Sequence, residues 1–511
     1  MDKKETRKLE KEQKKIEKEE RNKKFRRASV WQMTLMPFGS VAHNAFMFLM
    51  GLVSYYAAGP VGLGTVIASY VITGTRIFDG ITDPIVAVVF DKTNGKFGKI
   101  RLFIVIAWSL MSAATLLMFF TNHLVPEGFR LVYFIVLYMV YIIGYTFSGV
   151  AYNTGFTVVT NDPQQRPIIG GLQMVFSMLF FAIAFMYQSM YLVPKYGSVS
   201  DIGVFHEMAI MVVIFASIGF SLQIIAVWKR DRKENFGTGD ASERIKFKDL
   251  WPILKNNRPL QMSIIASVTD KVAMQISGNV VVTVMLFGII IGDYTLSGIL
   301  QGIVTIPTII VLFFVTRYAS KFGTKKGYVF AVWGCIITHI LLFLLLWLGD
   351  PTKIRMDNWG FMTIAFLILF AAGRSIQLTG ASLTFPMLPD IIDYETYRSG
   401  RFAPGIIGAI GSFIDKTVSS VSHTIVGLTL ATIGFKVAFP DVDTPYSESI
   451  FWVTMLLAYG GLILGWIASL IAMRFYELDK ERMVEIQDVL ESRRQENLEK
   501  VDDEPEAKVN S

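Results

Sequence analysis

Long apolar stretches recur along the whole chain and leave little choice of fold. About 20 apolar residues are needed to cross the ~30 Å hydrocarbon core of a bilayer. The composition agrees, because 52% of the 511 residues are hydrophobic and 18% are charged, against roughly 25% charged in soluble domains. We therefore predict an all-α membrane protein with twelve transmembrane helices. To within a few residues they span 34–57, 62–90, 101–122, 129–158, 168–192, 205–228, 259–291, 293–316, 327–349, 358–387, 404–434 and 448–474.

Basic residues gather in every second connection between these spans. The connection after the second span carries four of them between residues 92 and 101, and residues 229–258 carry many more. Because Lys and Arg remain on the cytoplasmic side, we predict a multi-pass protein of the cell membrane with both termini in the cytoplasm. Residues 1–33 interleave Lys and Glu. They are predicted to form a charged cytoplasmic helix, which is either solvated or in contact with anionic lipid.

The spans divide into two sets of six around residues 229–258. KFGKIR at 96–101 follows the second span and KFGTKKG at 321–327 follows the eighth, as a repeat of two halves predicts. Two six-helix halves are the layout of the major facilitator fold, whose substrate site lies between the halves near the middle of the membrane. The predicted parts are an N-terminal helix (1–33), a first half (34–228), a central cytoplasmic loop (229–258), a second half (259–475) and a cytoplasmic tail (476–511).

Three charged residues lie inside the second span. Arg76, Asp79 and Asp83 are spaced i, i+3 and i+7, which places them on one face of a helix. A charge at the centre of a bilayer costs at least about 2.5–3.5 kcal/mol, so this face must contact protein or water. One interpretation is an ion-pair network that only joins helices. Two carboxylates beside one arginine leave a surplus negative charge, however, and we predict that they bind Na⁺ or H⁺.

The cytoplasmic end of the second span is charged as well. Asp91 lies at the end of this span, and Lys99 and Arg101 precede the next one. Ion pairs at this point would hold the cytoplasmic side shut, so we predict a gating role for these residues. The alternative is that they only fix the topology.

Five short motifs along the chain belong together. They are R-x-x-D-x-x-x-D-P at 76–84, G-K-F-G-K-I-R at 95–101, NRPL at 257–260, LPDIIDYETYRSGRF at 388–402 and a lysine in span eleven, Lys416. Together they resemble the glycoside–pentoside–hexuronide:cation symporters, the family of the melibiose permease, over residues 35 to 475. The resemblance implies the major facilitator fold and cation-coupled transport. It also implies that Asp79 and Asp83 coordinate the cation and that Thr82 and Thr146 assist them.

The substrate side departs from the melibiose-type members of that family. These have one aspartate three residues after the threonine matched by Thr146, and another early in span one; here the positions hold Gly149 and Ser40 or Val41. We therefore do not expect recognition of galactosides. Other polar residues are candidates for binding substrate, although each also suits an interhelical hydrogen bond worth about 0.6 kcal/mol. They are Arg76, His43, Asn44, Tyr152, Asn153, Gln173, Asp270, Gln377 and Lys416.

Two pairs of adjacent opposite charges occur in the second half. They are Asp270–Lys271 in span seven and Asp415–Lys416 in span eleven. Successive residues point about 100° apart around a helix, so the members of a pair cannot share one face. We expect that only one member of each pair needs to point at the cavity. Lys416 is suited to neutralising the carboxylates of span two or to binding an anionic substrate group.

We predict a secondary transporter that couples Na⁺ or H⁺ to symport of a sugar, glycoside or related polar solute by alternating access. A carrier of an amphipathic substrate such as a lysolipid is the alternative on the same fold. A membrane-embedded enzyme is a remote third interpretation, because the five histidines are scattered and form no ligand motif. The sequence also has no ATP-binding G-x-x-x-x-G-K-[ST] loop and a single cysteine. We expect a monomer with no cofactor beyond the coupling ion and no nucleic-acid partner.

Overall fold

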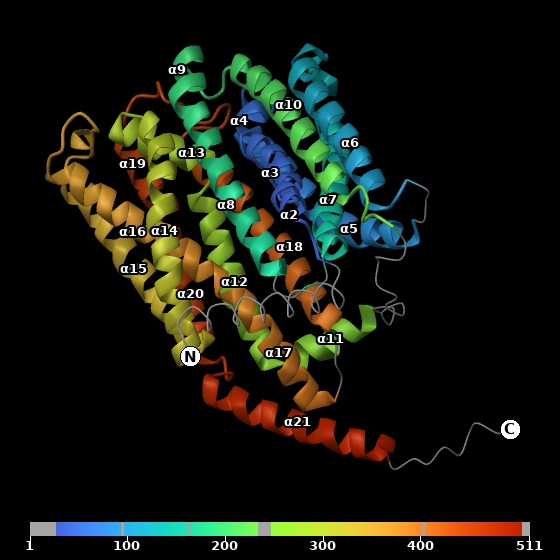
Figure 1. The fold of residues 1–511 in the computed structure, drawn as a ribbon. Helices are drawn as coiled ribbons and strands as arrows, with labels where there is room; N and C mark the ends of the chain where they lie inside the picture. Colours follow the sequence, from blue (N-terminus) through green and yellow to red (C-terminus); the bar gives the residue numbers. More distant parts are fainter. Residues whose placement is uncertain are drawn as a thin grey trace, which may run out of the picture. The chain divides into compact units, whose positions relative to one another are not determined.

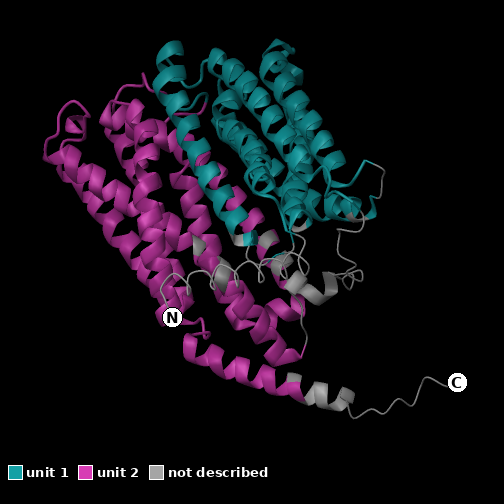
Figure 2. Cartoon of the chain, viewed as in Figure 1, with its two compact units in different colours: residues 1–240, 437–439 teal, residues 241–436, 440–511 magenta. Residues whose placement is uncertain are grey.

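The computed structural model describes residues 27–93, 97–160, 162, 165–232, 247–400 and 404–502. Within these ranges every regular element is a helix, and the only β contact is an isolated bridge between Arg355 and Asn358. The prediction of an all-α protein is confirmed. The chain divides into two units, residues 1–240 with 437–439 and residues 241–436 with 440–511 (Figure 2).

Unit 1 is built from long helices joined by short turns (Figure 1). A π-helical segment, η2, joins α8 to α9, and a 3-10 turn, η1, ends α6. The described elements are α2 (Val30–Leu35), α3 (Phe38–Gly51), α4 (Val53–Ala58), α5 (Thr65–Lys92), α6 (Ile100–Thr121), η1 (Asn122–Leu124), α7 (Glu127–Val159), α8 (Gln165–Met186), η2 (Tyr187–Leu192), α9 (Val193–Tyr196) and α10 (Ile202–Val227).

Unit 2 repeats this plan and adds helices outside the predicted spans. The described elements are α11 (Phe247–Asn256), α12 (Arg258–Ser277), α13 (Val280–Thr283), η4 (Val284–Ile291), α14 (Thr295–Phe322), α15 (Thr324–Leu348), η5 (Pro351–Lys353), α16 (Phe361–Ser382), α17 (Thr384–Ser399), α18 (Pro404–Thr432), α19 (Glu448–Met455), η6 (Leu456–Gly460), α20 (Gly461–Arg474) and α21 (Lys480–Asp502).

Among the described residues, nine helices are long and apolar enough to cross a membrane, or ten if α12 and the bent segment after it form one span. Two helices within the predicted spans, α5 with 28 residues and α18 with 29, are long enough to cross a membrane and are not among them. Both are too polar, because α5 carries the charged residues predicted for ion binding and α18 carries Asp415 and Lys416. The count of twelve spans stays a prediction, and the two polar helices are the ones on which function is expected.

Close helix contacts in each unit depend on small residues. In unit 1, a Cβ added to Gly219 of α10 would lie 2.9 Å from the Phe38 carbonyl oxygen of α3. In unit 2, a Cβ added to Gly465 of α20 would lie 3.0 Å from the Thr269 carbonyl oxygen of α12. Helices in membranes gain stability from such close backbone packing rather than from a hydrophobic driving force. These contacts therefore fix the position of α3 and α12, which both carry candidate site residues.

The loop that begins α6 is closed by a carboxylate from the end of α10. Gly98 has φ +80°, and a Cβ at this position would lie only 2.1 Å from Oδ2 of Asp231. Asp231 accepts hydrogen bonds from the backbone N–H groups of Lys99 at 3.0 Å and Arg101 at 2.9 Å. A carboxylate at this point satisfies N–H groups that the helix leaves without acceptors. The repeated K-F-G motif thus has a structural reason in unit 1: glycine is needed for both the φ angle and the space.

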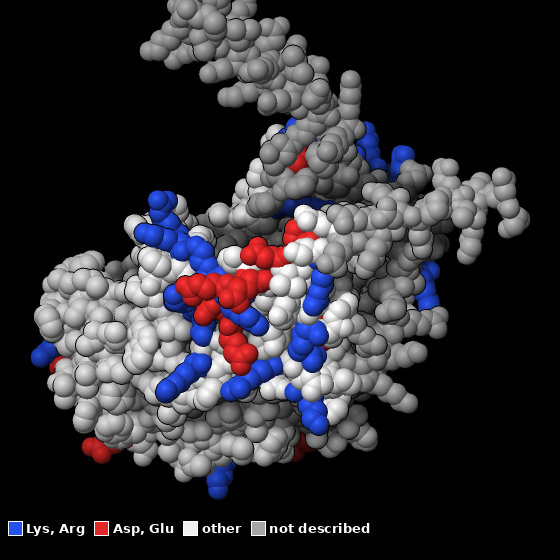
Figure 3. All heavy atoms as spheres, turned by 90° about the horizontal axis from the view of Figure 1, so that it is seen from below, with Lys and Arg blue, Asp and Glu red and all other residues white. Residues whose placement is uncertain are grey.

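α21 packs on α17 at one end of unit 2 (Figure 1). Ile486 of α21 is fully buried and belongs to the same apolar cluster as Ile391 of α17. Gln487 donates a hydrogen bond of 2.6 Å to Asp393. Seen from below, acidic side chains gather in the middle of this face, with Lys and Arg around them (Figure 3). The first part of the predicted tail is therefore a helix docked on its own unit.

Replacing Gly98 by alanine should lower the Tm of the purified protein more than the same change at Gly197. Both glycines have a positive φ, +80° and +77°, so each substitution carries a cost of about 1–2 kcal/mol for the left-handed backbone. Gly197 has no other atom within 4 Å of the added Cβ, whereas Gly98 faces Asp231. Displacing that carboxylate should cost a further ~0.5–2 kcal/mol, as loss of a helix cap does. Equal Tm values for the two variants would contradict this account of the loop.

Candidate functional site

The charged face predicted in span two lies along α5. Asp79 is buried, with 7% of its surface exposed, whereas Arg76 and Asp83 are partly buried. Pro84 follows Asp83 inside the helix. Since proline has no N–H, it cannot donate the usual helical hydrogen bond to the carbonyl oxygen of Gly80. One turn of α5 therefore carries two carboxylates and a carbonyl oxygen that lacks its helical partner.

Thr146 of α7 brings a second helix to Asp79. Its hydroxyl lies 3.2 Å from Oδ1 of Asp79 and 3.1 Å from the hydroxyl of Thr82. Thr82 in turn donates a hydrogen bond of 3.0 Å to the carbonyl oxygen of Asp79. Three of the four residues predicted for cation binding are thus in mutual contact, and Asp83 lies one turn further along the same helix. Carboxylate, hydroxyl and carbonyl oxygens are the donors that hard cations prefer.

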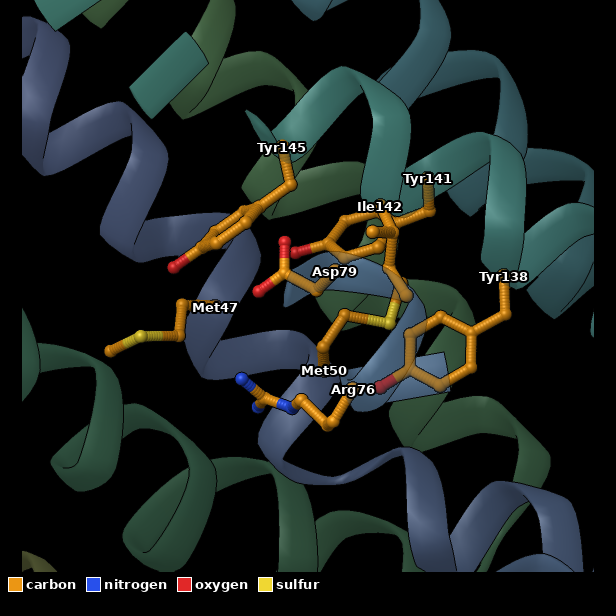
Figure 4. A pocket seen from close by; sticks show the side chains of 8 residues that line it. All are labelled: Met47, Met50, Arg76, Asp79, Tyr138, Tyr141, Ile142 and Tyr145. Atoms are coloured by element: carbon orange, nitrogen blue, oxygen red, sulfur yellow. The ribbon is translucent and has the colours of Figure 1, made fainter. Parts of the chain in front are cut away.

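A small cavity lies beside Asp79 between α3, α5 and α7 (Figure 4). It measures about 20 Å³ for the centre of a water-sized sphere, which is room for about one water molecule or one bare ion. Figure 4 shows the Asp79 carboxylate close to the Tyr145 and Tyr141 side chains, with the Arg76 guanidinium on the other side of the Met50 side chain. The residues that line the cavity are Met47, Met50, Arg76, Asp79, Tyr138, Tyr141, Ile142 and Tyr145.

The tyrosines of this cavity were not predicted. Tyr138, Tyr141 and Tyr145 are spaced i, i+3 and i+7 on α7, the same spacing that the charged residues have on α5. That spacing was available in the sequence as a signal. It was missed because an aromatic stripe on an apolar helix most often packs against lipid or a neighbouring helix, and only the charged stripe opposite distinguishes this one.

His43 of α3 lies against the same stretch of α7. Its ring stacks on the Tyr145 ring with the centroids 3.8 Å apart. The centroid of the Tyr152 ring lies 5.1 Å from that of His43, with the two rings tilted. Nδ1 of His43 is 2.5 Å from the hydroxyl of Ser148. A Cβ added to Gly149 would lie 3.8 Å from Cε1 of His43, an ordinary contact distance. The missing carboxylate at Gly149 is therefore not a consequence of crowding.

The other substrate candidates of unit 1 differ in their surroundings. Asn44 donates a hydrogen bond of 3.0 Å to Ser177, and Gln173 donates one of 2.7 Å to Ser40. Both bonds join α3 to α8, so these two side chains have the interhelical role that was the alternative for them. Asn153 is exposed.

Asp270 of α12 is enclosed in unit 2. It is 7% exposed and accepts hydrogen bonds from the hydroxyl of Tyr328 on α15 and, at 2.6 Å, from that of Ser469 on α20. Both carboxylate oxygens therefore already have a donor inside the bundle. This arrangement joins three helices, and the substrate role predicted for Asp270 stays a prediction.

Lys271, the residue after Asp270, points toward α18. Lys271 forms an ion pair with Asp415 of α18, so each adjacent pair places one member at this α12–α18 contact, as the geometry of a helix predicts. Lys416 is partly buried. Gln377 is buried on α16 and accepts a hydrogen bond of 2.8 Å from Arg374. The pairing of Lys271 with Asp415 was not predicted, because no pattern within one helix identifies its partner on another.

Two of the predicted gating residues, Lys99 and Arg101, contact other residues of their own unit. The side chain of Arg101 lies 3.3 Å from Asp231 and its guanidinium lies over the Trp228 ring at 4.8 Å. Lys99 binds Asp231 through its backbone N–H and lies 5.8 Å from the Phe90 ring. These contacts join the start of α6 to the end of α10. The side chain of Asp91 lies outside the described residues, and the gating role stays a prediction.

Comparison with known proteins shows the family. Residues 35–480 match the family described as MFS/sugar transport protein. The chain belongs to this family. It is 25% identical to the uncharacterized symporter YnaJ of Bacillus subtilis, over 86% of this chain and 90% of that one. It is 24% identical to the glucuronide carrier protein homolog of Escherichia coli, over 86% and 92%, and 22% identical to the isoprimeverose transporter of Lactiplantibacillus pentosus, over 89% of each.

Solved structures show the same fold at low identity. A mutant of the nucleoside transporter NupG superposes with a TM-score of 0.59 at 13% identity, over 87% of this chain and 99% of that one. The xylose transporter XylE of Escherichia coli, in a partially occluded inward-open conformation, superposes with a TM-score of 0.51 at 12% identity, over 88% and 99%. The major facilitator fold is therefore confirmed.

As a member of the MFS/sugar transport protein family, the chain is a multi-pass membrane transporter and not an enzyme. The resemblance to glycoside–pentoside–hexuronide symporters is confirmed by the same matches. In the described part of the chain, no group of three or more His, Cys, Asp or Glu side chains is placed to hold a metal ion.

Replacing Tyr328 by phenylalanine should destabilise unit 2. The change removes one of the two hydroxyl donors of the buried Asp270, and leaving a buried polar group without its partner costs about 1–3 kcal/mol. The Tm of the purified protein in detergent measures the effect. Tyr318→Phe is the matched control, because that ring stacks on Phe330 and the change leaves the Asp270 contacts unaltered. A Tm loss no larger than in the control would mean that Asp270 is not held by this network.

Proposed function

We propose that this transporter is a symporter that couples the movement of Na⁺ or H⁺ to that of a sugar or glycoside. The observation that carries the proposal is the contact of Asp79, Thr82 and Thr146 beside a cavity of ion size. The named relatives support the sugar part, since they include a glucuronide carrier homolog, an isoprimeverose transporter and a lactose permease. The coupling ion is inferred from the site alone.

The charges on α5 favour binding of a single positive ion. Asp79 and Asp83 are one turn apart on the same helix. In a site with low dielectric constant, two carboxylates this close raise each other's affinity for a cation or a proton. A bare Na⁺ or a protonated carboxylate fits a cavity for one water molecule, whereas a sugar ring does not. We therefore assign this cavity to the ion and place the solute beside it.

Coupling follows if the charged face changes its conformational preference when the ion binds. With the cation absent, the negative charge of Asp79 and Asp83 favours whichever state exposes it to water. With the cation bound, the same helix can pass through an occluded state. Linkage requires that the solute raises the affinity for the ion by the factor by which the ion raises the affinity for the solute. We infer that Asp79, Thr82, Thr146 and Asp83 provide the ion site for this exchange.

The proposed solute is a saccharide that the protein binds without the carboxylates that melibiose-type members use for galactosides. Gly149 offers no carboxylate to sugar hydroxyls, although its surroundings leave ordinary contact space. His43 and Tyr152 beside it offer an imidazole and an aromatic face. A lysolipid carrier is the competing function on this fold. Transport assays with a lysolipid and with the methyl glycosides of glucose, xylose, glucuronic acid and galactose distinguish the two functions. Transport of a lysolipid with none of the glycosides would replace the proposed solute.

Asp83→Asn should abolish accumulation of the solute against its gradient while leaving exchange of solute across the membrane intact. The change removes one of the two carboxylates of the proposed ion site, so the ion no longer binds and its gradient no longer drives transport. Proteoliposomes with an imposed Na⁺ or H⁺ gradient measure accumulation, and counterflow of labelled solute without a gradient measures exchange. Asp443→Asn, which neutralises an exposed loop carboxylate, is the control. Accumulation that persists in Asp83→Asn at the level of the control would contradict the assignment.

A further inference from the structure

A line of polar side chains follows α12 at intervals of four residues. Ser263, Ser267, Lys271 and Gln275 occupy positions i, i+4, i+8 and i+12, and each is partly or fully exposed. We call these four residues the α12 polar stripe. Residues four apart lie on one face of a helix. Lys271 is about 20 Å along α12 from its first residue, so the stripe crosses the depth at which hydrocarbon surrounds a membrane protein. Such side chains face protein or water and not lipid.

Asp415 of α18 faces this stripe. Its ion pair with Lys271 is accessible, with 24% of the Asp415 side chain and 44% of the Lys271 side chain exposed. In the described part of α18 the exposed large apolar residues are Phe413, Val418, Val421 and Leu428. At about 100° per residue Val418 lies about 60° from Asp415 around the helix, and the other three lie about 120–160° away. Asp415 therefore lies at the margin of the apolar side of α18, where an accessible ion pair requires water beside it.

The direction of Lys271 is set by its neighbour. Asp270 is held from two sides by Tyr328 and Ser469, and Gly465 lets α20 approach the backbone of α12 at Thr269. These contacts fix the rotation of α12 about its axis. Lys271, the next residue, then points about 100° away from Asp270, toward α18. The buried carboxylate thus positions the accessible ammonium group.

We propose that Lys271 and Asp415 form a saccharide-binding site in unit 2 that takes two neighbouring hydroxyl groups of a sugar ring. The proposal rests on the proposed function, since it names the part of the solute that this pair would bind. A carboxylate accepts hydrogen bonds from hydroxyl groups and an ammonium group donates to hydroxyl oxygens, so neighbouring hydroxyls satisfy both charges together. Charge-assisted bonds of this kind are about twice as strong as neutral ones. The pair has no net charge, which suits an uncharged ring portion.

A purely structural role is the competing explanation of this ion pair. α12 and α18 already pack against each other, and an accessible ion pair adds little to such a contact. The two explanations differ when the charges are exchanged. A structural pair tolerates Lys271→Asp combined with Asp415→Lys, whereas a binding site for a chiral ring does not, because donor and acceptor then occupy the wrong positions.

The test measures binding and transport of the methyl glycosides and of their single-deoxy analogues by the reconstituted full-length protein. Lys271→Met and Asp415→Asn should each raise the KM, and the Kd from the solute-induced rise in Tm, about tenfold or more. The concentration of cation that half-saturates transport should stay unchanged. In the unaltered protein, removing a hydroxyl that the pair binds should weaken binding about tenfold. The same deoxy analogue should lose nothing further in either variant, because its partner is already gone.

The charge-exchanged double variant should keep the Tm of the unaltered protein and its cation dependence without recovering the KM. Lys195→Met with Glu207→Gln, which removes an ion pair of 2.6 Å in unit 1, is the control and should leave the KM unchanged. Recovery of the KM by the exchange, or an equal penalty for deoxy analogues in the unaltered protein and the variants, would overturn the proposal. Glycoside binding without cation dependence would contradict the coupling alone, and no glycoside binding at all would overturn this site together with the proposed solute.

Discussion

The structure depends on the cost of placing charge where water is excluded. Every ionised side chain on a membrane helix must face a partner or an aqueous space, because hydrocarbon does not stabilise a charge. In this chain the constraint acts most strongly on α5 and α18, since both are long enough to span a membrane and carry charged residues within their length. The same two helices carry Asp79 with Asp83 and Asp415 with Lys416. The need to shelter these charges therefore limits where α5 and α18 can lie in the bundle.

Within that constraint, adjacent residues divide structural and functional roles between them. Asp270 is enclosed by hydroxyl donors and Lys271 is accessible. Asp79 is buried against Thr146, whereas Asp83, one turn on, is partly exposed. In each case the buried carboxylate fixes the rotation of its helix, and that rotation determines where the accessible charge points. A change at the buried member should consequently alter stability and function together, while a change at the accessible member should act mainly on function.

The periodicity of the sequence was sufficient for the helical class and for the charged face of α5, because both depend on spacing within one helix. The family motif placed Thr146 beside Asp79, and the structure brings them within 3.2 Å. What the sequence could not supply were partners across helices. The ion pair of Lys271 with Asp415 and the hydrogen bonds from the backbone N–H groups of Lys99 and Arg101 to Asp231 each join residues more than 100 positions apart. Two of the predicted spans, α5 and α18, are more polar than the other long helices of the described chain, because they carry the charged residues for which a function is predicted.

Ion uptake per molecule of solute bound tests the central claim most directly. Purified protein is titrated with the transported glycoside while ²²Na⁺ binding and, in weakly buffered solution, the pH are recorded in the same sample. The account predicts that solute binding is accompanied by uptake of one Na⁺ or one proton, and that Thr146→Val lowers the affinity for that ion while Thr115→Val, a change at another buried hydroxyl, does not. Solute binding with no uptake of either ion would contradict it.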